Sequence, residues 1–176
     1  NGAAYSQAYF NKEVSKNYAA AYAAYARTFP GVRITAINPP VSSMNIKNPY
    51  VQAMINDQGK VLDDIASVMY GSGNYINLRS TFEAHRGEYL FFKSDFPWTQ
   101  LAAYYAYCEY AKSVGLTPTP LSAFEDRVLT TEFIGLTNIY AQDERVNTFY
   151  DTLHAFMPRK EHTYTVYYNA EKDIKG

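Results

Sequence analysis

The chain has three histidines, whose side chains could act as a general base near neutral pH. His85 stands at the end of a predicted helix, where backbone carbonyls favour an imidazole, so we predict a structural role. His154 and His162 flank the polar run 157–160, where we expect solvated side chains. Either one could replace a missing catalytic base only if the fold placed it beside a nucleophile near Asp95.

Serine, carboxylate and cysteine side chains offer further chemistry, but their spacing is unfavourable. Ser42 and Ser43 follow a predicted strand, yet they lack the glycine-framed turn of a hydrolase nucleophile. The adjacent carboxylates at 63–64 and 125–126 point in different directions, unlike the facing pair that hydrolyses glycosides. Cys108 lies among tyrosines and alanines, which predicts a buried thiol. We therefore expect no cofactor and no metal site.

The composition argues against several classes of partner. With 16 basic and 17 acidic residues, the net charge of −1 gives no reason to expect binding to nucleic acid or to an anionic membrane surface. No apolar run approaches the roughly 20 residues that a membrane-spanning helix requires. The 18 tyrosines could mark a carbohydrate-facing surface, although such residues more often line the edge of a core. A length of 176 residues is sufficient for one core, so we expect a single domain over residues 1–176.

Three amphipathic helices are predicted from apolar residues that recur at intervals of three and four. They cover residues 14–29, 57–70 and 99–114. Thr99 is the expected N-cap of the last helix, and Gly115 is its expected stop. The first helix is predicted to present one apolar face, made of Val14, Tyr18, Tyr22, Tyr25 and Phe29.

Short β-branched and aromatic runs predict strands between and after these helices. The predicted strands lie at 32–37, 75–78 and 163–168, with a further extended piece at 88–92. From Pro120 to residue 150 we predict loops with short turns. Because strands alternate with helices, we predict an α/β fold with a mostly parallel sheet and helices on both faces.

The segment 89–107 resembles the signature stretch of the DHHW family, in which Tyr-x-x-Thr-Asp-His-His-Trp-Thr precedes a helix that opens Gly-Ala-Tyr-Tyr-Ala-Tyr. The corresponding run here is Ser94-Asp95-Phe96-Pro97-Trp98-Thr99, followed by Ala102-Ala103-Tyr104-Tyr105-Ala106-Tyr107. Two further stretches resemble the family's Pro-Thr-Ser loop and Asp-Phe-x-Gly turn, namely Asn38-Pro39-Pro40-Val41-Ser42-Ser43 and Phe133-Ile134-Gly135. The resemblance covers about residues 14–140. It implies a three-layer, flavodoxin-like SGNH-hydrolase fold, similar to the alginate O-acetyltransferase-like branch and incomplete in this chain.

The family resemblance implies a serine nucleophile, a histidine base and an aspartate that orients the base, acting on acyl esters of carbohydrate. Only the aspartate has a counterpart, Asp95. Pro97 stands where the catalytic histidine would be, and Phe96 replaces the family's other histidine. No Asp-Ser-Tyr or Gly-x-Ser turn follows Asp95. We therefore predict a degenerate domain that is catalytically inactive as given, and we expect the chain to be the front part of a longer protein.

Several functions remain open for such a domain. It could keep a carbohydrate-binding cleft lined by Trp98, Tyr104, Ser42 and Ser43, or it could be a structural or interaction scaffold whose side chains are packed in the core. Asp95 could be a relic of the triad, although we favour a cap that accepts hydrogen bonds from the backbone of Trp98 or Thr99. A further alternative is an active carbohydrate O-acetyl esterase or O-acetyltransferase with an unidentified base. The resemblance implies a secreted or cell-envelope location, and no protein partner is predicted.

Overall fold

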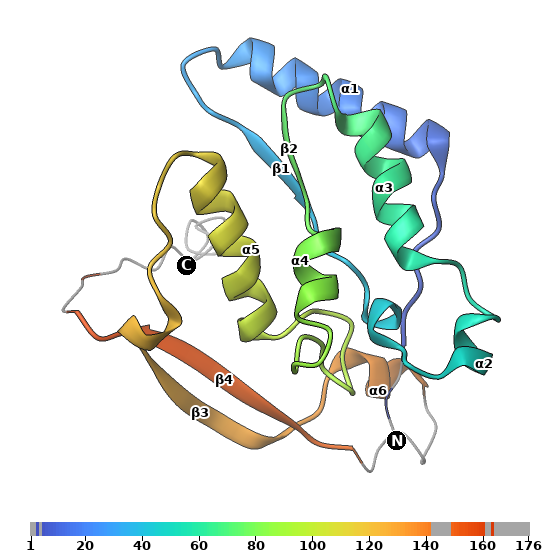
Figure 1. Cartoon of the computed structure of the whole chain (residues 1–176), viewed down its shortest axis with the longest axis vertical. Helices are drawn as coiled ribbons and strands as arrows, with labels where there is room; N and C mark the ends of the chain where they lie inside the picture. Colours follow the sequence, from blue (N-terminus) through green and yellow to red (C-terminus); the bar gives the residue numbers. More distant parts are fainter. Residues whose placement is uncertain (1–2, 4, 142–148, 161–162, 164–176) are drawn as a thin grey trace, which may run out of the picture.

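The structure is a computed structural model that describes residues 3, 5–141, 149–160 and 163. It confirms a mixed α/β chain with small sheets (Figure 1). The N-terminal elements are α1 (Lys12–Thr28), β1 (Thr35–Asn38), the 3₁₀ helix η1 (Ser42–Asn45), α2 (Pro49–Gln52), α3 (Gln58–Met69), β2 (Asn74–Asn77) and α4 (Arg79–Ala84). The later elements are α5 (Gln100–Ser113), the 3₁₀ helix η2 (Leu121–Ala123), β3 (Phe124–Phe133), α6 (Leu136–Ala141) and β4 (Asp151–Pro158).

The strands β1 and β2 form a parallel pair with helices on both sides (Figure 1). Successive strand residues point to opposite sides of the pair. Ala36 and Tyr75 pack into a cluster with residues of α1 and α3, whereas Ile37 and Ile76 pack against a second cluster that includes residues of α5. The wider three-layer sheet stays a prediction, since the described strands form this parallel pair and one antiparallel pair.

Capping side chains set the ends of the long helices as the sequence predicts. The Thr99 hydroxyl accepts a hydrogen bond from the Ala102 amide at the start of α5. Gly115 follows the end of this helix with a φ of 80°, a conformation that favours glycine. Asp57 caps α3 by accepting the amide of Lys60 at 3.1 Å. Local sequence signals therefore determine the boundaries of α3 and α5.

Helix α1 buries a narrower face than the periodicity predicts. Of the five residues of the predicted face, only Tyr22 is buried. The other four are between 49% and 63% exposed, namely Val14, Tyr18, Tyr25 and Phe29. The buried contacts of α1 are made by Ala19 and Tyr22, which pack with Met69 of α3 and Ala36 of β1. The small alanine side chain lets the helix approach its neighbours, so the broad aromatic stripe is not needed for packing.

The strands β3 and β4 form an antiparallel two-stranded sheet, which we call the hairpin although α6 lies between them in the sequence. The prediction of loops between Pro120 and residue 150 is therefore wrong for β3 and α6. Most of β3 is exposed. Because it begins with the charged run Glu125-Asp126-Arg127, it lacks the alternation of apolar and polar residues that marks a half-buried strand. The piece at 88–92 is not a regular strand either, because it contributes only an isolated bridge between Phe91 and Trp98. The predicted strand at 163–168 lies, apart from Thr163, outside the described residues.

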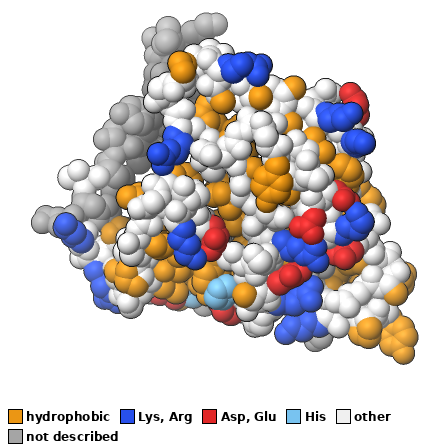
Figure 2. All heavy atoms as spheres, turned by 45° about the horizontal axis from the view of Figure 1, so that its top comes forward, with side chains coloured by type: hydrophobic (Ala, Val, Ile, Leu, Met, Phe, Trp, Pro, Cys, Tyr) orange, Lys and Arg blue, Asp and Glu red, His pale blue; other side chains and the backbone are white. Residues whose placement is uncertain are grey.

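The surface carries charged side chains of both signs close together, as Figure 2 shows for one face. Arg79, for example, pairs with both Asp63 and Glu83. This mixture is consistent with the net charge of −1 and offers no broad basic surface on the face drawn. Among the helices that the structure describes, none has the length and apolar character needed to cross a membrane.

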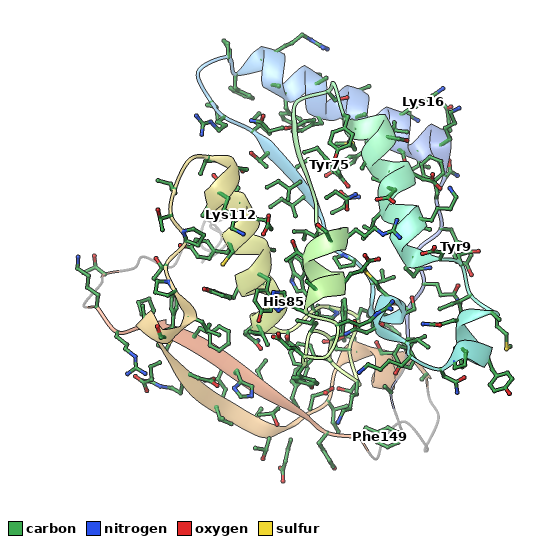
Figure 3. The ribbon with its side chains drawn as sticks, in the orientation of Figure 1. Tyr9, Lys16, Tyr75, His85, Lys112 and Phe149 are labelled. Carbon is green, nitrogen blue, oxygen red and sulfur yellow. The ribbon has the colours of Figure 1, made fainter. Side chains whose placement is uncertain are left out.

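Two tyrosines beside the parallel strands differ in how their hydroxyl groups are bonded. The Tyr22 hydroxyl donates to the carbonyl oxygens of Ile34 and Asn74, at 2.7 and 2.5 Å. The Tyr75 hydroxyl is buried and has no hydrogen-bond partner within the described part of the chain (Figure 3 shows its position). Burial raises the pKa of Tyr75 to about 12.

This difference predicts opposite results for the same substitution at the two positions. Tyr75→Phe removes an unsatisfied buried hydroxyl, so we expect the free energy of unfolding to stay the same or rise by up to about 1 kcal/mol. Tyr22→Phe removes the donor shared by two partly buried carbonyls and should lower it by about 1 kcal/mol. Urea denaturation of both variants measures the pair. A larger loss for Tyr75→Phe than for Tyr22→Phe would contradict the bonding described.

Candidate functional site

The segment that resembles the family signature forms a loop closed at its base. The Thr99 amide donates to the Leu90 carbonyl at 2.9 Å, and the Thr99 hydroxyl donates to the Tyr89 carbonyl at 2.6 Å. Phe91 and Trp98 are joined by an isolated antiparallel bridge one step further along. Because Thr99 also caps α5, the loop is fixed to the start of that helix. The residues from 93 to 97 form its tip, which we call the motif loop.

Asp151 of β4 anchors the motif loop to the hairpin. Its carboxylate is 2% exposed and accepts four hydrogen bonds from the described residues: from the Tyr89 hydroxyl, the Lys93 amide, the Ser94 amide and the Ser94 hydroxyl. Burial, followed by the bond to Asp151, raises the pKa of the Tyr89 hydroxyl above its ordinary value. Tyr89 therefore remains a hydrogen-bond donor over the usual pH range. A buried carboxylate with its lone pairs satisfied in this way is a strong structural joint.

Asp95, the counterpart of the family's catalytic aspartate, is 8% exposed and lies beside the turn before α6. One of its oxygens, Oδ1, accepts the amide of Phe96 at 2.8 Å and that of Leu136 at 3.1 Å. The expected cap on the Trp98 or Thr99 backbone is therefore not formed, because the Thr99 hydroxyl caps α5. Asp95 instead holds the motif loop against the first residue of α6.

The turn after β3 has no room for a side chain at Gly135. The Gly135 amide donates to the Ser94 hydroxyl at 3.0 Å, so the turn lies directly against the motif loop. A methyl group on Gly135 would lie less than 3.0 Å from the Cα, Cβ and Cγ atoms of Asp95. Close approach of two backbone segments, rather than a special backbone angle, is what requires glycine here.

The two positions that replace the family's histidines are at the surface. Phe96 is 45% exposed and its ring lies 6.4 Å from that of Tyr140, between centroids. Pro97 is also exposed. Proline has no group that can accept or donate a proton, so Asp95 has no base at the expected spacing.

The four residues predicted to line a carbohydrate cleft do not meet in one place. Trp98 stacks on Phe82 with ring centroids 5.8 Å apart and packs against the main core cluster. The Tyr104 hydroxyl donates to the Thr119 carbonyl at 3.0 Å, and burial raises the pKa of Tyr104 to about 12. Ser42 and Ser43 are both buried and bonded to Ser6: the Ser42 hydroxyl accepts the Ser6 amide, and the Ser43 hydroxyl donates to the Ser6 carbonyl.

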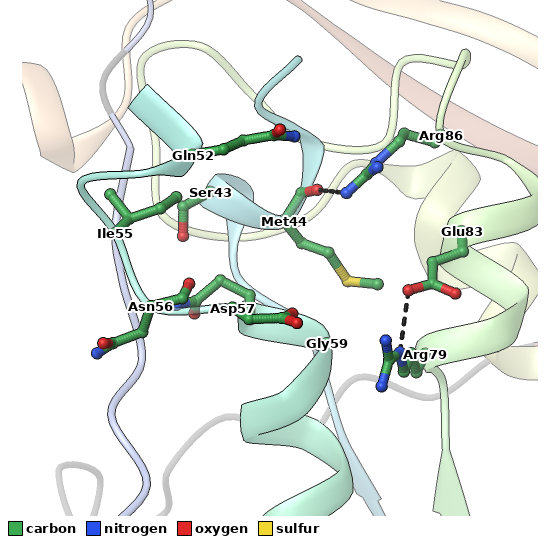
Figure 4. A pocket seen from close by; sticks show the side chains of 11 residues that line it. Ser43, Met44, Gln52, Ile55, Asn56, Asp57, Gly59, Arg79, Glu83 and Arg86 are labelled. Carbon is green, nitrogen blue, oxygen red and sulfur yellow. Dashed lines mark hydrogen bonds and ion pairs between the residues drawn. The ribbon is translucent and has the colours of Figure 1, made fainter. Parts of the chain in front are cut away.

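Ser43 does line a polar cavity of about 410 Å³ between η1, α3 and α4 (Figure 4). Two arginines border it. Arg79 donates to Glu83, and Arg86 donates to the Met44 carbonyl at 2.6 Å (Figure 4). Trp98 and Tyr104 do not line this cavity, so it is not the predicted cleft. The arginine charges are accompanied by Asp57 and Glu83 at the same cavity, which leaves it close to neutral.

The histidines occupy different surroundings. His85 ends α4 as predicted and stacks on Tyr105 with ring centroids 3.7 Å apart. Its Nδ1 bonds to Glu88 at 2.7 Å, and the Tyr105 hydroxyl followed by His85 lowers the pKa of the Glu88 carboxyl. His154 lies on strand β4 and not in a polar loop, so that prediction is wrong; its Nδ1 bonds to Asp126 at 2.7 Å.

His162 lies outside the described residues. Within residues 5–141 and 149–160, no group of three His, Cys, Asp or Glu side chains is arranged to hold a metal ion. Cys108 is a free thiol and is only partly buried, so full burial of the thiol, as predicted, is not observed.

Asp151 is the residue that sequence reasoning missed. It contacts Ser94 across 57 positions of the chain, and no local pattern links them. The one available signal is an aspartate within the aromatic and β-branched run Phe149-Tyr150-Asp151-Thr152-Leu153, where a buried carboxylate needs several donors. That signal indicates a buried polar contact but does not identify its partner.

Comparisons with known proteins extend these observations. A search of curated proteins finds no match. A DHHW family protein from Eubacterium siraeum has a solved structure with a TM-score of 0.67 and 20% identity, covering 80% of this chain and 48% of that one. Bacillus cereus PatB1, solved with a sulfonyl adduct, gives a TM-score of 0.62 and 14% identity, covering 89% and 53%.

The chain thus spans about half the length of these two solved structures, and at such identities they show the fold alone. The family model described as DHHW protein matches residues 1–175, almost the whole sequence. This chain therefore belongs to the DHHW protein family.

Proposed function

We propose that this chain is a non-catalytic, motif-bearing part of an SGNH-hydrolase-like domain, acting as a structural or interaction scaffold. The observation that carries the proposal is the state of Asp95. Its carboxylate accepts two backbone amides, and the position of the base two residues later is an exposed proline. The motif loop serves as a joint between α5, α6 and the hairpin.

The chemistry of acyl transfer supports an inactive chain. A serine hydroxyl needs a base to take its proton, and loss of the base from a triad lowers the rate by about a million-fold in well-studied enzymes. Here neither Pro97 nor Phe96 can serve as that base. The only serine hydroxyl bonded within the motif loop, Ser94, is fully buried and held by Asp151 and Gly135 among the described residues.

The placement of the predicted cleft residues favours the scaffold over a carbohydrate-binding domain. Trp98 packs on the core, and Ser42 and Ser43 are buried against Ser6. The Trp98 ring is therefore not free to stack on a sugar ring, and the two serine hydroxyls are already bonded. We further propose that residues 1–176 belong to a single domain of a longer, extracytoplasmic protein. The chain covers about half of each solved relative, which supports the greater length.

Esterase assays test the proposal directly. We expect no hydrolysis of 4-nitrophenyl acetate above the buffer rate by the unaltered chain. We also expect none by Pro97→His, because the restored base has no serine to activate. A serine esterase assayed in parallel shows that the substrate reports activity, and circular dichroism shows that the variant is folded. Turnover by the unaltered chain that disappears in Asp95→Asn would contradict the proposal.

One observation favours a second candidate, an esterase that uses His154 as its base. His154 is held by Asp126, the arrangement that orients a catalytic imidazole. Against it, no serine or cysteine among the described residues lines the cavity beside this pair, and the Thr99 hydroxyl there already donates to the Tyr89 carbonyl. Under this candidate, His154→Phe would abolish turnover that Asp95→Asn leaves intact.

A further inference from the structure

A cavity of about 310 Å³ lies between the start of α5 and one face of the β3–β4 hairpin. Its walls are mostly apolar and include Leu101 of α5, Leu121 of η2, Phe124 of β3 and Phe156 of β4. This volume is at the lower end of the range for ligand pockets, which suits a single ring better than an extended chain.

The hairpin register places two polar side chains on the same face as the two phenylalanines. Asp126 is two residues from Phe124 on β3, and His154 is two residues from Phe156 on β4. Asp126 pairs directly with Phe156 across the strands. Because side chains alternate between the faces of a strand, all four lie toward α5, and all four line the cavity.

Asp126 orients His154 so that one ring nitrogen remains available. The His154 Nδ1 bonds to Asp126 Oδ1 at 2.7 Å, and the His154 side chain is 29% exposed. With the Nδ1 proton donated to the carboxylate, Nε2 carries a lone pair and can accept a proton donor. Within the described part of the chain, Nε2 makes no hydrogen bond, and neither does the side-chain amide of Gln100, which also lines the cavity.

We propose that this cavity binds a small ring compound that bears a hydroxyl group, with the hydroxyl donated to His154 Nε2. The phenylalanine and leucine side chains would contact the faces of the ring. The free groups at the cavity are Nε2 and the second oxygen of Asp126, which accept, and the Gln100 amide, which can both accept and donate. They therefore complement a hydroxyl donor. A phenol and a single sugar ring share this chemistry.

The proposed site is separate from the motif loop. Asp95, Phe96 and Pro97 do not line the cavity. Tyr89 and Thr99 do, but their hydroxyls are bonded to Asp151 and to the Tyr89 carbonyl. His154 is also the base of the second candidate esterase, but binding at this cavity requires no turnover, so it can be tested independently of esterase activity.

The test follows the histidine ring resonances by NMR while the chain is titrated with 4-methylphenol or with methyl β-glucopyranoside. We expect one of these probes to shift the His154 resonances in a saturable manner at millimolar concentrations. Saturation by the phenol alone assigns an aromatic ligand, and saturation by the glycoside alone assigns a sugar. For a phenol, 4-methylanisole, which lacks the hydroxyl proton, should bind about tenfold more weakly, the effect of one hydrogen bond.

Two variants separate the histidine from general effects. His154→Phe keeps a ring but removes the acceptor, and its affinity for the active probe, measured from the line broadening of the probe's own resonances, should be about tenfold lower than that of the unaltered chain. His85→Phe is the matched control, because His85 is also bonded to a carboxylate at 2.7 Å but lies outside this cavity. Its binding should be unchanged. The proposal is overturned if neither probe gives a saturable His154 shift, or if removing the hydroxyl proton leaves the affinity unchanged.

Discussion

Asp151→Ala should lower the free energy of unfolding by about 3–5 kcal/mol, since it leaves four donors, two of them buried, without an acceptor. Asp151 holds the Lys93 and Ser94 amides together with the Tyr89 and Ser94 hydroxyls. The two bonds to Ser94 are buried and those to Tyr89 and Lys93 are partly buried, so water could replace the lost carboxylate only in part. A typical domain has only about 5–15 kcal/mol of stability. We therefore expect the variant to unfold at a much lower urea concentration than the unaltered chain.

Urea denaturation measures this effect, and the hairpin offers a matched control. Asp126 is also a strand aspartate, but its side chain is 55% exposed and paired only with His154 among the described residues. Asp126→Ala should therefore change the free energy of unfolding by less than about 1 kcal/mol. Asp151→Asn should fall between the two, because it keeps an acceptor but turns an amide donor toward other donors. Equal stability of the Asp151→Ala and Asp126→Ala variants would show that Asp151 is not a structural joint.

The helices show which parts of this fold can be predicted from sequence. The start of α5 is determined by the Thr99 hydroxyl, and that of α3 by Asp57, within three residues of each side chain. Such signals are local, so a single sequence contains them in full. The burial of α1 is different. Its aromatic stripe has helical periodicity, but which face is covered depends on α3 and the strands, and the contact is made by Ala19 and Tyr22.

The hairpin shows why the remainder could not be predicted. The strand β3 has a polar, largely exposed sequence, which does not mark it as a strand. Its partner β4 begins only at Asp151, and no sequence signal links the two strands. The candidate site has the same difficulty. Asp95 was identified from the motif, but its partner Leu136 is 41 positions away. Because these contacts join distant segments, motif spacing could identify the aspartate without identifying what it bonds to.

The joint around Asp95 also explains in chemical terms why a glycine stands in the turn after β3. Gly135 donates its amide to Ser94, while Leu136 donates to Asp95. The motif loop and the turn therefore share one set of hydrogen bonds, and neither can move without breaking bonds to the other. A scaffold that has lost the base of the triad would still need this joint in order to fold.

Gly135→Ala should test that dependence with a single methyl group. The added carbon would lie less than 3.0 Å from three atoms of Asp95, a residue held in place by its bonds to Phe96 and Leu136. We expect a loss of about 2–3 kcal/mol, as for other overpacked sites. For a chain of this size, that loss corresponds to a fall of roughly 4–12 °C in Tm, measured by circular dichroism.

Gly87→Ala is the control for the loss of glycine itself, because a methyl group at Gly87 meets no atom within 4 Å. Its free energy of unfolding should change by no more than about 0.5 kcal/mol, and its Tm should change correspondingly little. The double variant Asp95→Gly/Gly135→Ala removes two of the three clashing atoms, so its loss should be smaller than the sum of the single losses. Strict additivity would mean that Gly135 and Asp95 do not interact, which would contradict the close approach described.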